Sequence, residues 1–142
     1  MRIFLIALLF LLPINAFANQ LPKATVWKSP YCGCCGKWID HMKAAGFQVE
    51  TRNVEQMQSI KRQAGIPEKL ESCHTAVIGG YLIEGHVPAA DIKRLLAEKR
   101  KTRGLAVPGM PSGSPGMENG EHDPYEVVTF DKKGTTSVFS KH

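Results

Sequence analysis

Apolar and polar positions follow two periods along the chain, and each period predicts one kind of element. Short β-prone runs and strict alternation predict strands, whereas apolar residues three and four apart predict helices. The expected strands are residues 24–27, 47–54, 75–78, 81–83, 125–130 and 135–139. The expected helices are one opened by the cysteines at 32–35 and stopped by Gly46, one over 55–64, and one that starts at 88–91.

This order of strand, helix, strand, helix, hairpin and helix is that of the thioredoxin-like α/β fold (β-α-β-α-β-β-α), and the chain follows it from Thr25 to about Arg100. In that fold the loop after the first strand presents cysteines at a helix N-terminus. Residues 104–120 hold five glycines, three prolines and two methionines, too many turn formers for regular structure. We expect a long Gly/Pro/Met-rich loop there, followed by a C-terminal β-hairpin.

Residues 1–18 have the pattern of a secretory signal peptide, with an apolar core at 3–12 and a small-residue cleavage box at 16–18. The apolar run is broken at Pro13 and is shorter than the roughly 20 residues that cross a bilayer. We therefore expect cleavage before Asn19, no stable membrane anchor afterwards, and an oxidising periplasmic location.

The remaining residues, 19–142, are enough for a single domain with its own hydrophobic core, so cysteines are not needed as the main stabiliser. The full chain carries a net charge of +5, and its positive residues gather around 93–103. Such a run is typical of a solvated helix face. Composition therefore gives no reason to expect nucleic-acid or anionic-membrane binding.

The four cysteines lie in two short motifs, with Cys32, Cys34 and Cys35 within four residues and Cys73 beside His74. Three thiols in one turn cannot all pair with distant partners when only one other cysteine exists. A structural disulfide framework is therefore the weaker interpretation. A Cys32–Cys35 disulfide, with Cys34 and Cys73 inert or paired, is the alternative to metal binding.

Cys32 and Cys35 have the C-x-x-C spacing. In the first turn of a helix they share a face, and free backbone N–H groups there favour the thiolate. Both can act as nucleophiles or as metal ligands. Cys34 is rotated by roughly 100° from Cys35, so it either points away from the site or bridges to a second metal ion.

The second motif is informative when it is laid against glutaredoxins, in which a cis-proline packs on the C-x-x-C motif. With the hairpin glycines setting the register, His74 takes the place of that proline and Cys73 precedes it. His86 falls in a stretch that faces the thiols. A proline restricts metal access to the sulfurs, whereas histidine adds a donor. Cys73, His74 and His86 are therefore candidate ligands, and ligation is favoured over thiol exchange.

Met110 and Met117 each lie in a Pro-Gly-Met unit of the irregular loop, where a thioether ligand and a packing anchor are equally consistent with the sequence. We expect this loop to fold as a lid over the cysteine end, because loops of that length in a compact domain are commonly functional. Other residues of the same types are expected to lie in the core (Met42, Met57) or in solvent (His41, His122, His142).

Thiolate and thioether ligands select Cu(I), and imidazole also accepts Cu(II), so this donor set suits copper that changes oxidation state. Structural zinc sites normally use two spaced ligand pairs. Three thiols in one turn instead suit the bridging sulfurs of a polynuclear copper cluster. Zinc held by three cysteines and one histidine stays a chemical alternative.

Four motifs occur in order, at 31–35 (YCGCC), 72–76 (SCHTA), 84–89 (EGHVPA) and 104–118 (two Pro-Gly-Met units). Together they resemble the CopG-type periplasmic copper-resistance proteins, over nearly the whole chain after the signal. The resemblance implies a thioredoxin-like domain with a cysteine-bridged cluster of several copper ions and a role in copper redox conversion. It also implies copper ions, and other periplasmic copper-handling proteins, as partners.

The leading hypothesis is a periplasmic copper-binding protein for copper resistance that cycles Cu(I) and Cu(II), as an oxidoreductase or an electron carrier. The alternative is a thiol-disulfide oxidoreductase in which Cys32 attacks and Cys35 resolves. Cys34 and His74 argue against it, because dithiol exchange needs neither. A passive store of copper or zinc is a third hypothesis.

Overall fold

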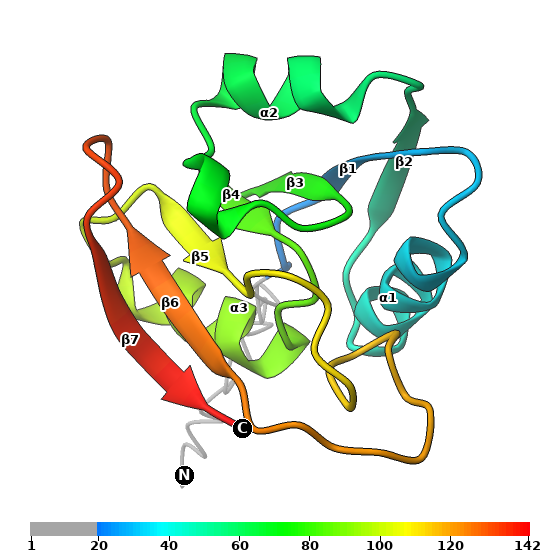
Figure 1. The fold of residues 1–142 in the computed structure, drawn as a ribbon. Coiled ribbons are helices and arrows are strands. Elements are labelled where there is room, and N and C mark those ends of the chain that lie inside the picture. The colour runs from blue at the N-terminus through cyan, green and yellow to red at the C-terminus, as the bar shows by residue number, and fades with distance from the viewer. Residues whose placement is uncertain (1–19) are drawn as a thin grey trace, which may run out of the picture.

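The computed structural model describes residues 20–142, so the predicted signal peptide at 1–18 lies outside the described residues. One seven-stranded sheet runs through the molecule, with strand order β2-β1-β3-β4-β5-β6-β7 (Figure 1). Its strands are β1 (Ala24–Lys28), β2 (Val49–Asn53), β3 (Thr75–Ile78), β4 (Tyr81–Glu84), β5 (Gly104–Ala106), β6 (Glu126–Phe130) and β7 (Thr136–Lys141). The helices are α1 (Gly33–Ala44), α2 (Met57–Ala64), α3 (Ala89–Glu98) and a short 3-10 helix, η1 (Glu68–Leu70).

The described elements confirm a mixed α/β fold in the expected order. β1 pairs in parallel with β2 and antiparallel with β3, and β3 and β4 form the predicted hairpin. Gly79 and Gly80 turn that hairpin with φ values of 56° and 84°, a left-handed conformation that glycine adopts without strain. In residues 20–142, every helix is too short or too polar to cross a membrane.

The prediction that residues 104–120 form only a loop is wrong at its start. Gly104–Ala106 form β5, which pairs in parallel with β4 and antiparallel with β6. All three residues are buried, and a Cβ on Gly104 would lie 1.7 Å from the carbonyl oxygen of Leu82. A three-residue strand at the edge of a glycine-rich segment has too few positions to show a period of two. Through β5, the C-terminal hairpin of β6 and β7 extends the sheet.

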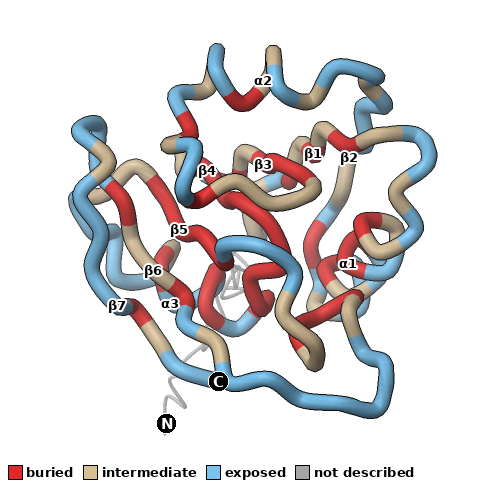
Figure 2. Tube along the Cα trace, in the orientation of Figure 1, coloured by how far each residue is buried: buried red, intermediate tan, exposed pale blue. Residues whose placement is uncertain are grey.

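Buried residues run through the strands and the helix faces that pack on them (Figure 2), and the hydrophobic ones form two clusters. On one side, Trp38 and Met42 of α1 pack with Ile92 of α3, as their helical spacing predicts. On the other side, a smaller cluster follows α2 and η1 (Ile66, Leu70, Leu82, Ala106, Phe130). This arrangement fixes the N-terminus of α1 next to the loops that precede β3 and follow β4.

Candidate metal centre

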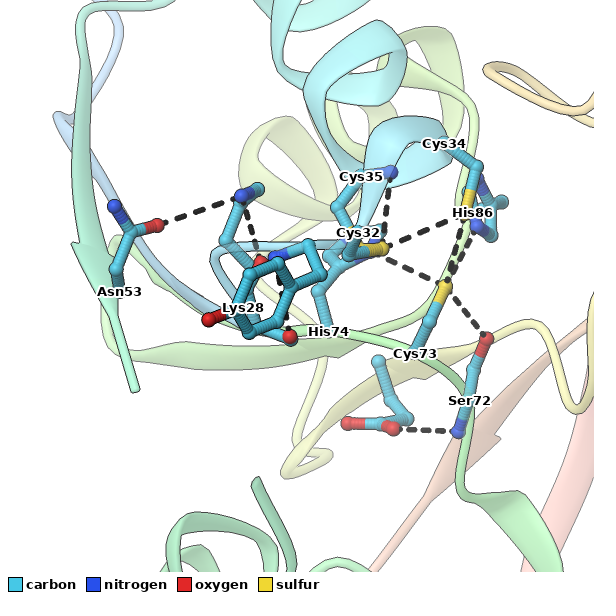
Figure 3. The surroundings of a disulfide bond; sticks show 12 residues. Lys28, Cys32, Cys34, Cys35, Asn53, Ser72, Cys73, His74 and His86 are labelled. Atoms are coloured by element: carbon cyan, nitrogen blue, oxygen red, sulfur yellow. Dashed lines mark hydrogen bonds between the residues drawn. A yellow bond between two sulfur atoms is a disulfide. The ribbon is translucent and has the colours of Figure 1, made fainter. Parts of the chain in front are cut away.

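Cys32 caps the N-terminus of α1, where its Sγ accepts a hydrogen bond from Cys35 N at 3.3 Å. Cys32 and Cys35 are joined as a disulfide (Figure 3). Cys32 is partly exposed, whereas Cys35 is fully buried. Because a disulfide offers no thiolate, these two sulfurs become strong metal ligands only after two-electron reduction.

Cys34 faces the site, which resolves the question that helix geometry left open. Its Sγ lies 3.5 Å from Cys32 Sγ and 3.8 Å from Cys73 Sγ. Figure 3 shows the cysteine sulfurs converging from the first turn of α1 and from the loop before β3. The four sulfurs lie within 4.8 Å of one another, close enough to bind the same metal ions.

A second group shares Cys73 with the first. Cys73 Sγ lies 2.9 Å from His86 Nε2 and 3.8 Å from His74 Nδ1. The potential ligand atoms of Cys73, His74 and His86 also lie within 4.8 Å of one another. Cys73 therefore belongs to two groups of potential ligands, one made of four cysteine sulfurs and one made of its own sulfur and two histidine imidazoles.

The loop after β5 fixes the orientation of His86. His86 Nδ1 donates a hydrogen bond to the carbonyl oxygen of Pro115 at 2.7 Å. Because a carbonyl can only accept, the proton lies on Nδ1, and the lone pair of Nε2 faces Cys73. Metal-binding histidines are commonly held in this way. Burial lowers the pKa of His86, which favours the neutral imidazole that binds metal.

His74 is fully buried, with its ring centroid 4.3 Å from that of Trp38 and 5.1 Å from that of His86. Its Nε2 has no hydrogen-bond partner among the described residues. Burial, reinforced by His86 and Lys61, holds the pKa of His74 well below its ordinary value. A buried neutral imidazole with unused bonding capacity fits a ligand or a group adjoining the metal.

Burial is also the main cause that raises the pKa of the Cys73 thiol to about 11, with a further contribution from Cys34. Cys73 is therefore protonated at neutral pH without metal. A metal ion that binds its sulfur must displace this proton, so binding releases protons and weakens as the pH falls. The donor set of clustered thiols and neutral imidazoles suits a soft metal ion.

Residues 107–120 cover part of the centre, as the predicted lid does. A Cβ on Gly116, whose φ is 91°, would lie 2.7 Å from the carbonyl oxygen of Cys34 and 2.9 Å from Trp38 N. Only glycine lets the loop approach the first turn of α1 so closely. The Ser72 hydroxyl donates to the carbonyl of Gly109 on the other side of the centre.

The two methionines of this loop lie next to the glycines that make these contacts. Met110 is 54% exposed, and Met117 is half-buried. Of the methionines assigned to the core, Met42 is fully buried and Met57 is half-buried.

A buried pair of charged residues close to the centre was not expected from the sequence. The Lys61 ammonium pairs with the Glu84 carboxylate in the interior. Burial raises the pKa of Glu84, and Lys61 opposes that change. Both residues stand in polar or alternating stretches, where solvent exposure is the ordinary expectation. Their burial follows only from how α2 lies on the sheet.

The prediction for His41 is wrong, because this residue is half-buried rather than solvated. His41 Nε2 accepts a hydrogen bond from Ala89 N at 3.0 Å at the start of α3, where Pro88 supplies no side-chain cap. Burial lowers the pKa of His41. His122 and His142 are exposed as expected, although His142 Nε2 also lies 2.7 Å from Asp91 Oδ2.

Comparison with known proteins gives both a family and structural relatives. A family model described as "Protein of unknown function, DUF411" matches residues 70–117. A solved structure described as copper resistance protein CopG, form 2, is 44% identical, with a TM-score of 0.81 over 87% of this chain and 99% of that chain. Form 1 is also 44% identical, with a TM-score of 0.79 over 85% and 98%. No curated protein matches the chain.

Proposed function

Since the chain belongs to the family of the copper resistance protein CopG, we propose that it binds several copper ions through its clustered cysteines and histidines and thereby contributes to copper resistance. The observation that carries this proposal is the position of Cys73. Its sulfur belongs both to the four-cysteine group and to the group with His74 and His86. One thiolate there can bridge two copper ions.

The fold supports the same proposal. We also propose a thioredoxin-like domain, which the element order, the parallel β1–β2 pair and the cysteines at the N-terminus of α1 support. In such a domain the first helix terminus favours thiolates. We assign this chain to that fold, and we place its action in the periplasm, where the expected signal peptide would deliver it.

Copper is the substrate in this proposal, and Cys32 with Cys35 provides a two-electron couple for it. Two thiols lose two protons and two electrons as their S–S bond forms, and two Cu(II) ions each accept one electron to become Cu(I). The thiols of Cys34 and Cys73 and the imidazole of His86 then hold the product. An external dithiol reduces the disulfide and closes the cycle.

Anaerobic competition between the reduced protein and a Cu(I) chelator tests this function. We expect the wild-type protein to bind more than one Cu(I) ion per chain, and Cys73→Ser to lose most of that capacity because it removes the shared sulfur. Cys35→Ser and His86→Gln are expected to lose part of it. His122→Gln is the matched control, because His122 is exposed outside both groups. Unchanged uptake in Cys73→Ser would rule out the shared site.

One observation favours a second function, thiol-disulfide exchange. The partly exposed Cys32 is bonded to the buried Cys35, the arrangement in which an outer sulfur is attacked and an inner one resolves. This function predicts that the metal-free protein reduces the disulfides of insulin with a dithiol donor, and that Cys32→Ser abolishes the reaction. Efficient exchange together with no tight copper binding would favour it over the copper function.

A further inference from the structure

The buried ion pair of Lys61 and Glu84 has no part in the proposed copper chemistry, yet it lies next to the loop that carries Cys73. Lys61 projects from α2 and is 2% exposed, and Glu84 ends β4 and is 0% exposed. Lys61 Nζ donates to Glu84 Oε1 and also, at 3.1 Å, to the hydroxyl of Thr75.

The Glu84 carboxylate joins this pair to the metal centre. Its Oε1 accepts a hydrogen bond from Ser72 N at 2.7 Å, and its Oε2 accepts one from the Thr75 hydroxyl at 2.7 Å. Ser72 and Thr75 immediately flank the dipeptide of Cys73 and His74. One carboxylate therefore fixes both ends of that dipeptide.

Backbone hydrogen bonds extend the link to His86. Gly85 N donates to the carbonyl of His74 at 3.0 Å, and Val107 N donates to the carbonyl of Glu84 at 3.0 Å. Glu84 thus lies where three segments meet. These are the loop that carries Cys73, the residues that lead from β4 to His86, and the end of β5, where the lid begins.

Stability alone does not account for this pair. Burying two charges carries a large desolvation cost, and well-packed apolar residues often replace such a pair with no loss of stability. An apolar side chain at position 84, however, would leave the partly buried N–H of Ser72 and the buried hydroxyl of Thr75 without an acceptor. The carboxylate supplies several acceptor sites at one fixed point, which an apolar residue cannot do.

We propose that Glu84 is a positioning residue that holds Cys73 at its distance from His86 and Cys34, and that Lys61 holds the Glu84 carboxylate in place. The inference rests on the proposed copper function for its effect on metal binding. Glu84 acts through the backbone of Ser72 and the side chain of Thr75.

The test compares Glu84→Gln with the wild-type protein, with and without copper. Glutamine keeps the size but replaces one acceptor oxygen by a donor, so it cannot serve all three donors. We expect the affinity for Cu(I) to fall about 10- to 100-fold, as when other outer partners of metal ligands are changed. The copper–thiolate charge-transfer band is expected to shift. In the metal-free, reduced protein, amide exchange at Ser72 and alkylation of Cys73 are expected to become several-fold faster.

Two controls separate positioning from general destabilisation. Ile66→Ala removes buried side-chain volume from the cluster beside α2 but leaves the Glu84 hydrogen bonds intact. Glu50→Gln removes a carboxylate from an exposed pair with Arg52. Both are expected to keep wild-type copper affinity and wild-type Cys73 alkylation. If Ile66→Ala lost as much affinity as Glu84→Gln, the positioning role would be overturned.

Further variants keep the test decisive if Glu84→Gln does not fold. Lys61→Met/Glu84→Gln removes both charges, and Thr75→Val removes the donor to Oε2 with little change of shape. Each is expected to speed alkylation of Cys73. Wild-type alkylation and wild-type copper affinity in the folded variants would overturn the inference. A wild-type protein that bound no copper would instead refute the proposed function, and Ser72 exchange and Cys73 alkylation would still test Glu84.

Discussion

The two sides of the metal centre are built in different ways. Cys32, Cys34 and Cys35 lie within a single helical turn, and the local hydrogen bond from Cys35 N to Cys32 Sγ helps to hold that turn. The side with Cys73 and His86 has no such local frame. It depends on the bond of Ser72 to Glu84, on the bond of His86 to Pro115 and on the contact of Gly116 with α1, each of which joins segments distant in sequence. The cysteine turn is therefore expected to tolerate backbone changes that the histidine side does not.

The largest expected effect is that of Gly116→Ala. A non-glycine residue at its φ of 91° costs roughly 1–2 kcal/mol by itself. The added Cβ would also lie 2.7 Å from the Cys34 carbonyl and 3.3 Å from His86 Nδ1, so the loop must move and the bond from His86 to Pro115 weakens. We expect a loss of stability of about 2–4 kcal/mol, from strain and overpacking together, with a lower affinity for Cu(I).

Gly120→Ala is the matched control for this change. Gly120 has the same φ of 91°, but a Cβ there meets nothing within 4 Å. The control is expected to lose only the cost of the backbone conformation and to bind copper as the wild-type protein does. Urea unfolding and Cu(I) competition measure both effects. Equal losses in the two variants would show that the contact of Gly116 with α1 does not support the centre.

The second prediction concerns the dependence of stability on pH in the metal-free protein. Burial lowers the pKa of His74 below its ordinary 6.5, so between the two values the unfolded chain binds more protons than the folded one. The stabilising contribution is complete above about pH 6.5 and is lost as the pH falls, at up to roughly 1.4 kcal/mol per pH unit for one proton. His86 and His41 shift in the same direction.

Cys73 limits stability on the alkaline side. Its pKa is raised from 9.0 to about 11, so the unfolded thiol ionises first and stability falls as the pH rises between these values. Urea unfolding of the reduced protein from pH 5 to pH 10 is expected to give a maximum between about 6.5 and 9. His41→Gln keeps an acceptor for Ala89 N and should reduce the acidic slope. A flat profile would contradict this prediction.

The contrast between local contacts in the cysteine turn and long-range contacts on the histidine side also explains what could be predicted from the sequence. The core positions of α1 and the Gly79–Gly80 hairpin follow from local periodicity and turn chemistry, and the structure confirms them. Strand β5 and the inward direction of Cys34 depend on neighbours far away in the chain. Lys61 shows the limit most clearly. It lies in a mainly polar helix, so its pattern predicts solvent exposure, whereas the packing of α2 brings it to Glu84.

A third, smaller effect is expected in the cysteine turn itself. Gly36 lies in the first part of α1, and a Cβ there meets nothing within 4 Å. Gly36→Ala is expected to raise the stability by roughly 0.5–1 kcal/mol, because it lowers the entropy of the unfolded chain without strain. Copper stoichiometry should not change. Urea unfolding and Cu(I) competition check both statements, and a marked loss of copper binding would show that this turn is as sensitive as the histidine side.

The smallest expected effects concern the two thioethers, which we propose as further soft donors or shields of the centre. Met117 is half-buried and follows Gly116, whereas Met110 is 54% exposed. Met117→Leu is therefore expected to lower Cu(I) affinity several-fold and to speed oxidation of the bound copper by oxygen. Met110→Leu should have the weaker effect because Met110 is the more exposed, whereas in both variants leucine keeps the volume and removes only the sulfur.

The two leucine variants are best measured side by side, by chelator competition under anaerobic conditions and by the rate of copper oxidation after air is admitted. A larger loss of Cu(I) affinity in Met110→Leu than in Met117→Leu would mean that the exposed thioether acts first, as a point of entry for copper. Wild-type values in both variants would leave the loop with one role in the centre, the orientation of His86 through Pro115. In that case the lid would support the histidine side through its backbone alone.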